Sequence, residues 1–185
     1  MKDAEENAFQ KFQILLNTKE LARLESEPRS SREPLESLEE KLDRTFSETK
    51  VLPSAQPLIC SLVLLWHDYL DESHSISQGI HSDDGSFLHG IMHRREPDYT
   101  NAKYWFSRVV EHPCYPIIAE KADGFLSKAN ARELKAKLVN DANWDASAFV
   151  DACEDALREN DDQTIFILQQ IQEIEFKTLL EHFLR

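Results

Sequence analysis

Histidines are the residues of this sequence whose types and spacing are best suited to chemistry. Six of the seven lie between positions 67 and 112, and two of them, His89 and His93, are four residues apart. On a helix this spacing places both imidazoles on one face, close enough to share a ligand. The same spacing holds a zinc ion in HExxH helices, but here Gly90 stands where that motif has its glutamate. A metal would therefore need a third ligand from another segment.

Helices that face one another in a bundle can supply such a third ligand. The candidate residues are His67, Asp68, Asp71, His74 and Glu96. We predict His67, His89 and His93 as the metal-ligand set of a divalent cation, since imidazole suits zinc and its neighbours in the periodic table. The alternative is that these histidines only form hydrogen bonds in a groove. A histidine beside Asp68 or Asp71 could also serve as an oriented general base.

Arginines beside the histidines suggest an anionic ligand. The guanidinium groups of Arg94, Arg95 and Arg108 have the geometry that binds carboxylate or phosphate. The alternative, which the many nearby acids favour, is pairing within the chain to Glu96, Asp98 or Glu111. Together these residues predict a ligand groove with the following lining: His67, Asp68, His74, His89, His93, Arg94, Arg95, Glu96, Tyr104 and Arg108.

Composition excludes several classes of protein. The chain has 34 acidic and 21 basic residues, a net charge of −13, which argues against binding nucleic acid. The longest apolar run, residues 58–66, is much shorter than the ~20 residues that cross a bilayer, so no membrane span is expected. Three scattered cysteines and no signal-peptide pattern predict a cytoplasmic protein. No P-loop, GxGxxG or CxxC pattern occurs, so no nucleotide or iron–sulfur cofactor is expected.

The apolar residues recur with a helical period throughout, and the sequence has only four glycines, so we predict an all-α fold. We expect a single domain over 1–185, with N-terminal helices and linkers in 1–57, central helices in 58–113 and C-terminal helices in 114–185. The first predicted helices are 7–25 and 34–46. A third begins at residue 58, a turn near 68–71 ends it, and a fourth then runs to residue 80. The remaining predicted helices are 83–95, 99–111, 116–127, 130–140, 145–160 and 162–184.

The segment from Ser86 to Pro113 resembles a tetratricopeptide repeat. Gly90 and Ala102 fall at the small positions where two antiparallel helices approach, and Phe106 falls at the aromatic position between them. The resemblance implies antiparallel helix pairs over about 58–113, capped by the terminal helices. Pro97 departs from the usual turn glycine, and no ~34-residue period recurs. Residues 88–106 also resemble an uncharacterised bacterial protein family, which implies no mechanism.

Three functions remain open at this stage. The leading hypothesis is a binding or scaffold module whose groove holds a peptide or a small anionic ligand. The rival is a metal-dependent or acid–base enzyme, which requires at least three histidine or carboxylate groups to converge. The third is a homodimer formed through the last helix, which requires apolar residues of that helix to be exposed in the monomer, namely Ile165, Ile171, Phe176 and Phe183.

Overall fold

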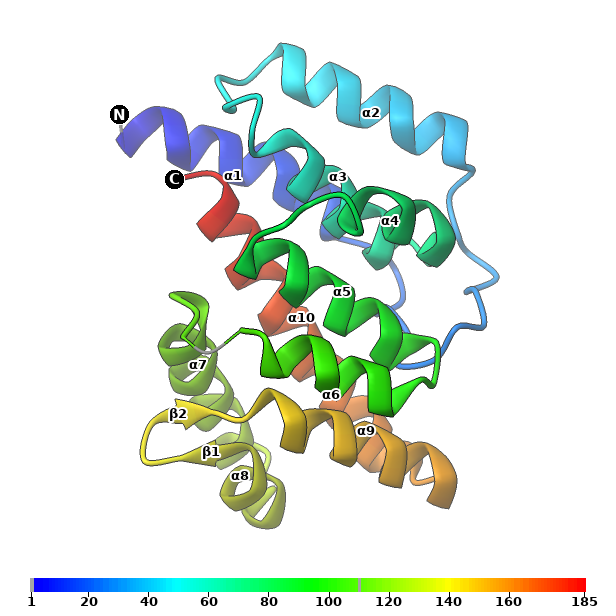
Figure 1. Ribbon diagram of the computed structural model, residues 1–185, viewed down its shortest axis with the longest axis vertical. Helices are drawn as coiled ribbons and strands as arrows, with labels where there is room; N and C mark the ends of the chain where they lie inside the picture. The colour runs from blue at the N-terminus through cyan, green and yellow to red at the C-terminus, as the bar shows by residue number, and fades with distance from the viewer. Residues whose placement is uncertain (1, 110) are drawn as a thin grey trace.

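The computed structural model describes residues 2–109 and 111–185, and within them the protein is all-α apart from one two-stranded hairpin (Figure 1). This confirms the predicted fold class. The elements in chain order are α1 (Lys2–Leu16), α2 (Leu35–Ser47), α3 (Gln56–Trp66), α4 (Leu70–Ser77), α5 (Asp83–Arg95), α6 (Tyr99–Ser107), α7 (Cys114–Lys128), α8 (Arg132–Leu138), β1 (Val139–Asn140), β2 (Asn143–Trp144), α9 (Ala146–Glu159) and α10 (Asp162–Phe183).

Helices α3 to α6 pack as consecutive neighbours, each against the next along the chain (Figure 1). The C-terminal helix α10 contacts α1, α3, α7 and α9, so it joins the two ends of the chain to the middle. Its Phe176 meets Trp66 of α3 edge-on, with ring centroids 5.2 Å apart. The hydrophobic core therefore lies between α10 and the central helices.

Four helix starts match the capping residues that the sequence offers. The side chains of Ser82, Asp98, Asp145 and Asp161 each accept a hydrogen bond from the backbone amide three residues later, at 2.8 to 3.3 Å. These bonds satisfy amides that have no partner inside the helix. The predicted starts of α5, α6, α9 and α10 are confirmed to within a residue or so.

The prediction of one helix over 7–25 is wrong. Helix α1 ends at Leu16, and the chain then runs without helix to α2. The side-chain amide of Gln172, on α10, donates to the backbone carbonyls of Ala22 and Arg23 at 3.1 Å each. These contacts from α10 satisfy carbonyls of a segment that is not helical, so helical periodicity alone does not decide its conformation.

The hairpin was not predicted from the sequence. Helix α8 ends at Leu138, and β1 and β2 pair antiparallel across Asp141 and Ala142. These two residues have φ of 47° and 63°, the left-handed conformation of a tight hairpin turn, which usually selects Asn-Gly or Asp-Gly. The sequence offers alanine in the glycine position, so the usual signal is missing.

The helix predicted over 99–111 ends at Ser107 in the structure, and Val110 lies outside the described residues.

Helices α5 and α6 approach closely at Gly90. A Cβ atom on this glycine would lie 2.9 Å from Cζ of Phe106, too close for any side chain without a shift of the ring. The close approach expected between this glycine and this aromatic is therefore present, and Ala102 is fully buried beside it. The wider likeness to tetratricopeptide repeats stays a prediction.

The apolar stripe of α10 lies in the core. Ile171, Phe176 and Phe183 are buried, and Ile165 is partly buried. The exposure that a dimer seam on this stripe requires is therefore not met by these residues. Neither α10 nor any other helix of the described segments combines the length and the apolar character needed to cross a membrane.

Candidate metal centre

Three histidines converge between α4 and α5. His74 extends from α4, while His89 and His93 extend from one face of α5, as their spacing predicts. A ring nitrogen from each lies within 4.8 Å of the others. The centroid of the His89 ring lies 4.6 Å from that of His74 and 4.9 Å from that of His93. We call His74, His89 and His93 the histidine cluster.

The most unusual member of the cluster is His89. Its side chain is buried, with 3% of the residue exposed, yet Nδ1 has no hydrogen-bond partner among the described residues. Burial lowers the pKa of His89 to about 4, and the neighbouring charges of His74 and His93 lower it further in the same direction. The imidazole is therefore neutral at pH 7 and retains a lone pair for a ligand.

Both ring nitrogens of His93 have a polar partner. A carboxylate oxygen of Glu96 lies 3.2 Å from Nδ1, and the side-chain amide of Asn101 lies 3.1 Å from Nε2. Burial lowers the pKa of His93 although the charge of Glu96 opposes this shift. A neutral ring that donates from Nδ1 to Glu96 uses its Nε2 lone pair to accept a hydrogen bond from the Asn101 amide, so a metal at Nε2 would have to displace that amide. This carboxylate–histidine arrangement orients metal-ligating imidazoles in many proteins.

Helix α6 forms one wall of the cluster. The ring of Trp105 stacks on His89, with centroids 4.0 Å apart and an interplanar angle of 21°. Trp105 is half-buried, and Tyr104 and Arg108 beside it are exposed. The stack fixes the plane of the His89 imidazole, so this ring does not need to lose much rotational freedom when it binds a ligand.

The cluster fits a small divalent cation. Zinc–nitrogen bonds of 2.0–2.1 Å in tetrahedral geometry place ligand nitrogens about 3.3 Å apart. The ring nitrogens lie within 4.8 Å of one another, so binding a tetrahedral ion would require the side chains to rotate until these separations reach this value. Three imidazole ligands suit zinc, copper, nickel or ferrous iron, whereas calcium and magnesium prefer oxygen ligands. Three protein ligands leave one position of a tetrahedral ion for water or a substrate.

His67 lies apart from the cluster, so the predicted set His67, His89 and His93 does not assemble. Nε2 of His67 lies 2.7 Å from the carbonyl oxygen of Leu15, to which it donates, and the residue is buried. Burial lowers its pKa. His67 therefore links α1 to the end of α3 by a hydrogen bond. The third member of the cluster is His74 and not His67.

Arg94 and Arg95 do not line a groove, because both are fully buried. Arg94 pairs with Glu175 of α10 at 2.7 Å, and Arg95 pairs with Asp68 at 2.6 Å. The predicted alternative of intrachain pairing is correct in kind, but the partners differ from those expected. Glu175 is 81 residues away along the chain, and sequence proximity gives no signal for it.

Asp68 is the centre of a buried ion-pair cluster, which we define as Arg29, Asp68 and Arg95. Arg29 donates to Asp68 at 2.7 Å from the loop that follows α1. Burial alone would raise the pKa of Asp68, but the two guanidinium groups lower it by more, so the pKa is below its ordinary value. The cluster therefore holds a carboxylate, charged at neutral pH, between two arginines.

This ion-pair cluster also positions the histidines. Asp68 has φ of 65° in the turn between α3 and α4, and its partner Arg95 follows His93 by two residues on α5. The pair thus fixes the start of α4, which carries His74, against the end of α5. A hydrogen bond of 2.7 Å between the hydroxyls of Ser61 and Ser73 joins α3 to α4 in addition.

A second convergence consists of Asp84, His112 and His182. The Nε2 atoms of both histidines lie 3.0 Å from the same oxygen of Asp84. Nδ1 of His112 accepts the backbone amide of Cys114 at 3.2 Å, so the ring proton is on Nε2 and is donated to Asp84. A metal at Nε2 would require His112 to lose both ring protons. This group is therefore a satisfied hydrogen-bond cluster and fits a metal poorly.

Comparison of the chain with models of protein families, with curated protein sequences and with solved structures found no match.

The cysteines offer no nucleophile. Cys114 and Cys153 are buried, and burial raises the pKa of each thiol to about 12. Cys60 is partly buried, and its pKa is raised to about 11, chiefly by burial. All three are neutral thiols at pH 7, and thiolate is the form that attacks and that binds metal. In this environment each cysteine packs as a small apolar residue.

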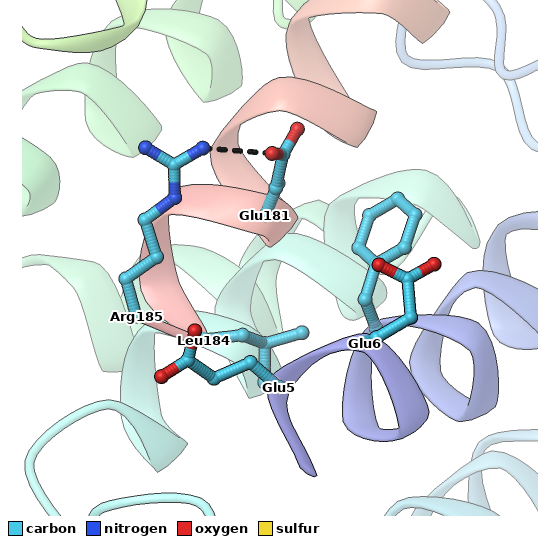
Figure 2. Close-up of a pocket in the computed structure, with 6 residues that line it drawn as sticks. Glu5, Glu6, Glu181, Leu184 and Arg185 are labelled. Carbon is cyan, nitrogen blue, oxygen red and sulfur yellow. Dashed lines mark hydrogen bonds and ion pairs between the residues drawn. The ribbon is translucent and has the colours of Figure 1, made fainter. Parts of the chain in front are cut away.

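A cavity of about 450 Å³ lies between α1 and the end of α10 (Figure 2). Glu5 and Glu6 from α1 face Glu181 and Arg185 across it. The guanidinium of Arg185 is already paired with Glu181 at 2.7 Å. The lining contains no histidine, cysteine or unpaired base, so this cavity carries none of the chemistry of the histidine cluster.

Proposed function

We propose that this protein binds a divalent transition metal through His74, His89 and His93 and uses the remaining coordination position for Lewis-acid chemistry. Three neutral imidazoles leave the full charge of the cation in place. If His74, His89 and His93 held a zinc ion, it would lower the pKa of a bound water to about 7 and so would supply a nucleophile at neutral pH. Hydration or hydrolysis is the reaction class that such a centre favours.

The observation that carries this proposal is the unpartnered Nδ1 of the buried His89. A buried polar atom without a hydrogen bond costs about 1–3 kcal/mol, which a folded protein rarely accepts without a reason. A metal ion that binds the converging ring nitrogens supplies that reason. Glu96 supports the same assignment, because its carboxylate orients His93 from the outer side.

Cobalt titration of the full chain, prepared without a histidine tag and stripped of metal, tests the proposal. We expect one equivalent of Co²⁺ to bind, with visible absorption bands of a tetrahedral site. Fluorescence of Trp105 should be quenched at the same time, because its ring stacks on His89. His74→Gln, His89→Gln and His93→Gln should each weaken binding roughly 100-fold or more, since loss of an outer partner alone costs about 10- to 100-fold.

The matched control is His81→Gln. His81 is exposed and lies outside the cluster, so this variant should bind Co²⁺ as the wild type does. Failure of the wild type to bind Co²⁺ or Zn²⁺ contradicts the metal centre. Equal loss of binding in His81→Gln and His89→Gln contradicts its location.

Reactivity is tested separately with an ester probe. Zn²⁺-loaded protein should hydrolyse 4-nitrophenyl acetate faster than metal-free protein, and the rate should rise with pH as bound water ionises near pH 7. The metal-loaded rate should disappear in His89→Gln. A protein that binds zinc without this rate increase would be a metal-binding protein with no Lewis-acid activity towards this probe.

The peptide or anion groove remains the second candidate function. Of its ten predicted residues, Asp68, Arg94 and Arg95 are buried in ion pairs and His67 is buried against α1, so they are closed to a ligand. Glu96, Tyr104 and Arg108 are exposed next to the histidine cluster. Any groove for an anion would therefore be built around the cluster and α6.

A further inference from the structure

One face of α6 runs along the histidine cluster. Asn101, Trp105 and Arg108 are spaced by four and three residues, so their side chains form a single stripe on the helix. Asn101 contacts His93 at 3.1 Å, and Trp105 stacks on His89 at 4.0 Å. Arg108 continues this stripe about one turn beyond the last histidine contact.

The guanidinium of Arg108 is available to a ligand. The side chain is exposed, and no carboxylate among residues 2–109 and 111–185 forms an ion pair with it. One nitrogen donates to the hydroxyl of Tyr104 at 3.2 Å, and the guanidinium carbon lies 5.3 Å from the centroid of the Trp105 ring. The other donors of its fork have no described carboxylate partner, in a chain with 34 acidic residues.

We propose that the metal centre and Arg108 together bind a small organic carboxylate, with Trp105 and Tyr104 as the wall between them; this inference rests on the proposed function. One polar group of the ligand takes the open position on the cation, and its carboxylate pairs with the fork of Arg108. Trp105 is a neighbour of both His89 and Arg108, so one aromatic side chain joins the two groups that would hold the ligand.

Charge explains why a carboxylate would bind only to the loaded protein. The surface is acidic, with a net charge of −13, and Glu96 and Asp98 are exposed near the cluster. Without the cation these charges repel an anion. The two positive charges of the metal and that of Arg108 reverse the local potential. Arginine suits this task because its planar fork matches the two oxygens of a carboxylate.

Succinate binding to the Co²⁺-loaded protein tests the inference through the visible spectrum of the metal. We expect saturable changes with succinate, and weak or absent ones with succinamide, which has the same length and no charge. Arg108→Gln should weaken succinate binding about tenfold while Co²⁺ binding is unchanged. Arg132→Gln, which removes an exposed arginine on α8, is the matched control and should leave both constants unchanged.

The outcomes separate this inference from the metal site itself. If the wild-type protein does not bind Co²⁺, the proposed function is overturned. Normal Co²⁺ binding with succinate affinity that does not depend on Arg108 overturns only the carboxylate subsite. Inorganic phosphate is the third arm: if it binds more tightly than succinate and depends on Arg108, the ligand class is phosphate and the carboxylate assignment is overturned.

Discussion

The ion-pair cluster of Arg29, Asp68 and Arg95 and the histidine cluster of His74, His89 and His93 lie a short way apart along α5 and are both mainly buried. They differ in how their polar atoms are paired. Each charge of the ion-pair cluster meets an opposite charge at 2.6 or 2.7 Å, although Nε of Arg95 has no partner. In the histidine cluster, by contrast, the buried His89 has no described partner at Nδ1.

The difference is the one expected between a structural role and the binding role proposed for the histidine cluster. Burying an ion pair carries a desolvation penalty, but separating the two buried charges is much more unfavourable. The pair therefore holds the chain in the one geometry that keeps the charges together. An unpaired imidazole contributes nothing to the fold that an apolar side chain of similar size would not contribute. We infer that the ion-pair cluster holds the backbone in place and that the histidine cluster is kept open for a ligand.

The largest effect is expected for Asp68→Asn. This change leaves two buried guanidinium groups without their counter-charge, so the free energy of unfolding should fall by about 3–5 kcal/mol. Asparagine tolerates the left-handed backbone at this position, so the loss reports on charge. Denaturant unfolding of the metal-free protein measures it. Asp71→Asn, an exposed neighbour, should stay within about 0.5 kcal/mol of the wild type.

The pH dependence of the unfolding free energy, compared between wild type and Asp68→Asn, tests the same charge more closely. The folded-state pKa of Asp68 is below its unfolded value of 3.8, so its stabilising contribution is present above pH 3.8. It is lost as the pH falls through the folded-state pKa. The stability difference between wild type and Asp68→Asn should therefore be constant from pH 8 to about pH 5 and shrink below about pH 4. A difference that shrinks already between pH 7 and pH 6 would contradict this assignment.

A smaller loss is expected for Gly90→Ala, which tests the close approach of α5 and α6 behind the histidine cluster. The added methyl would lie 2.9 Å from Cζ of Phe106, and the overpacking should cost about 1–3 kcal/mol. Gly124→Ala is the matched helical control, since a Cβ there meets no atom within 4 Å. It should be neutral or stabilise the protein by up to about 1 kcal/mol. Equal effects of the two changes would mean that the helix approach is not tight.

The smallest effect on folding is expected for His89→Leu. Replacing the ring with an apolar side chain removes the unpartnered Nδ1, which is favourable, but also removes the stack on Trp105, which is unfavourable. Because these effects oppose each other, the unfolding free energy of metal-free protein should change by less than about 1 kcal/mol. Zinc should then stabilise the wild type by RT ln(1 + [Zn²⁺]/Kd), a gain that grows with the logarithm of the free zinc concentration, and leave the variant unchanged. Thermal unfolding with and without Zn²⁺ measures both. A loss as large as that of Asp68→Asn in metal-free protein would break the distinction between the two clusters.

Much of the fold follows from local signals. The capping residues Ser82, Asp98, Asp145 and Asp161 each satisfy an amide within their own first turn, so the starts of four helices are encoded over a few residues. The non-helical segment after Leu16 is different. Its conformation depends on Gln172, some 150 residues away, which no local pattern reports.

The candidate site divides in the same way. The spacing of His89 and His93 fixes their shared face, because both lie on one helix. The choice of His74 over His67 as the third residue depends on which side of the Asp68 turn faces α5. Arg94 and Arg95 resembled ligand-binding residues in the sequence, but their carboxylate partners come from α10 and from that turn.

Local sequence patterns suffice to predict the helical class, the starts of several helices and the pair of imidazoles on α5, because each depends on residues within one or two turns of one another. Helix packing was needed to show which arginines are buried, which histidine completes the cluster, and that Arg108 lies beside Trp105 without an acidic partner in the described chain. The physical reason is that charge pairing and ligand convergence act over distances in space. Which residues meet there is settled by helix packing.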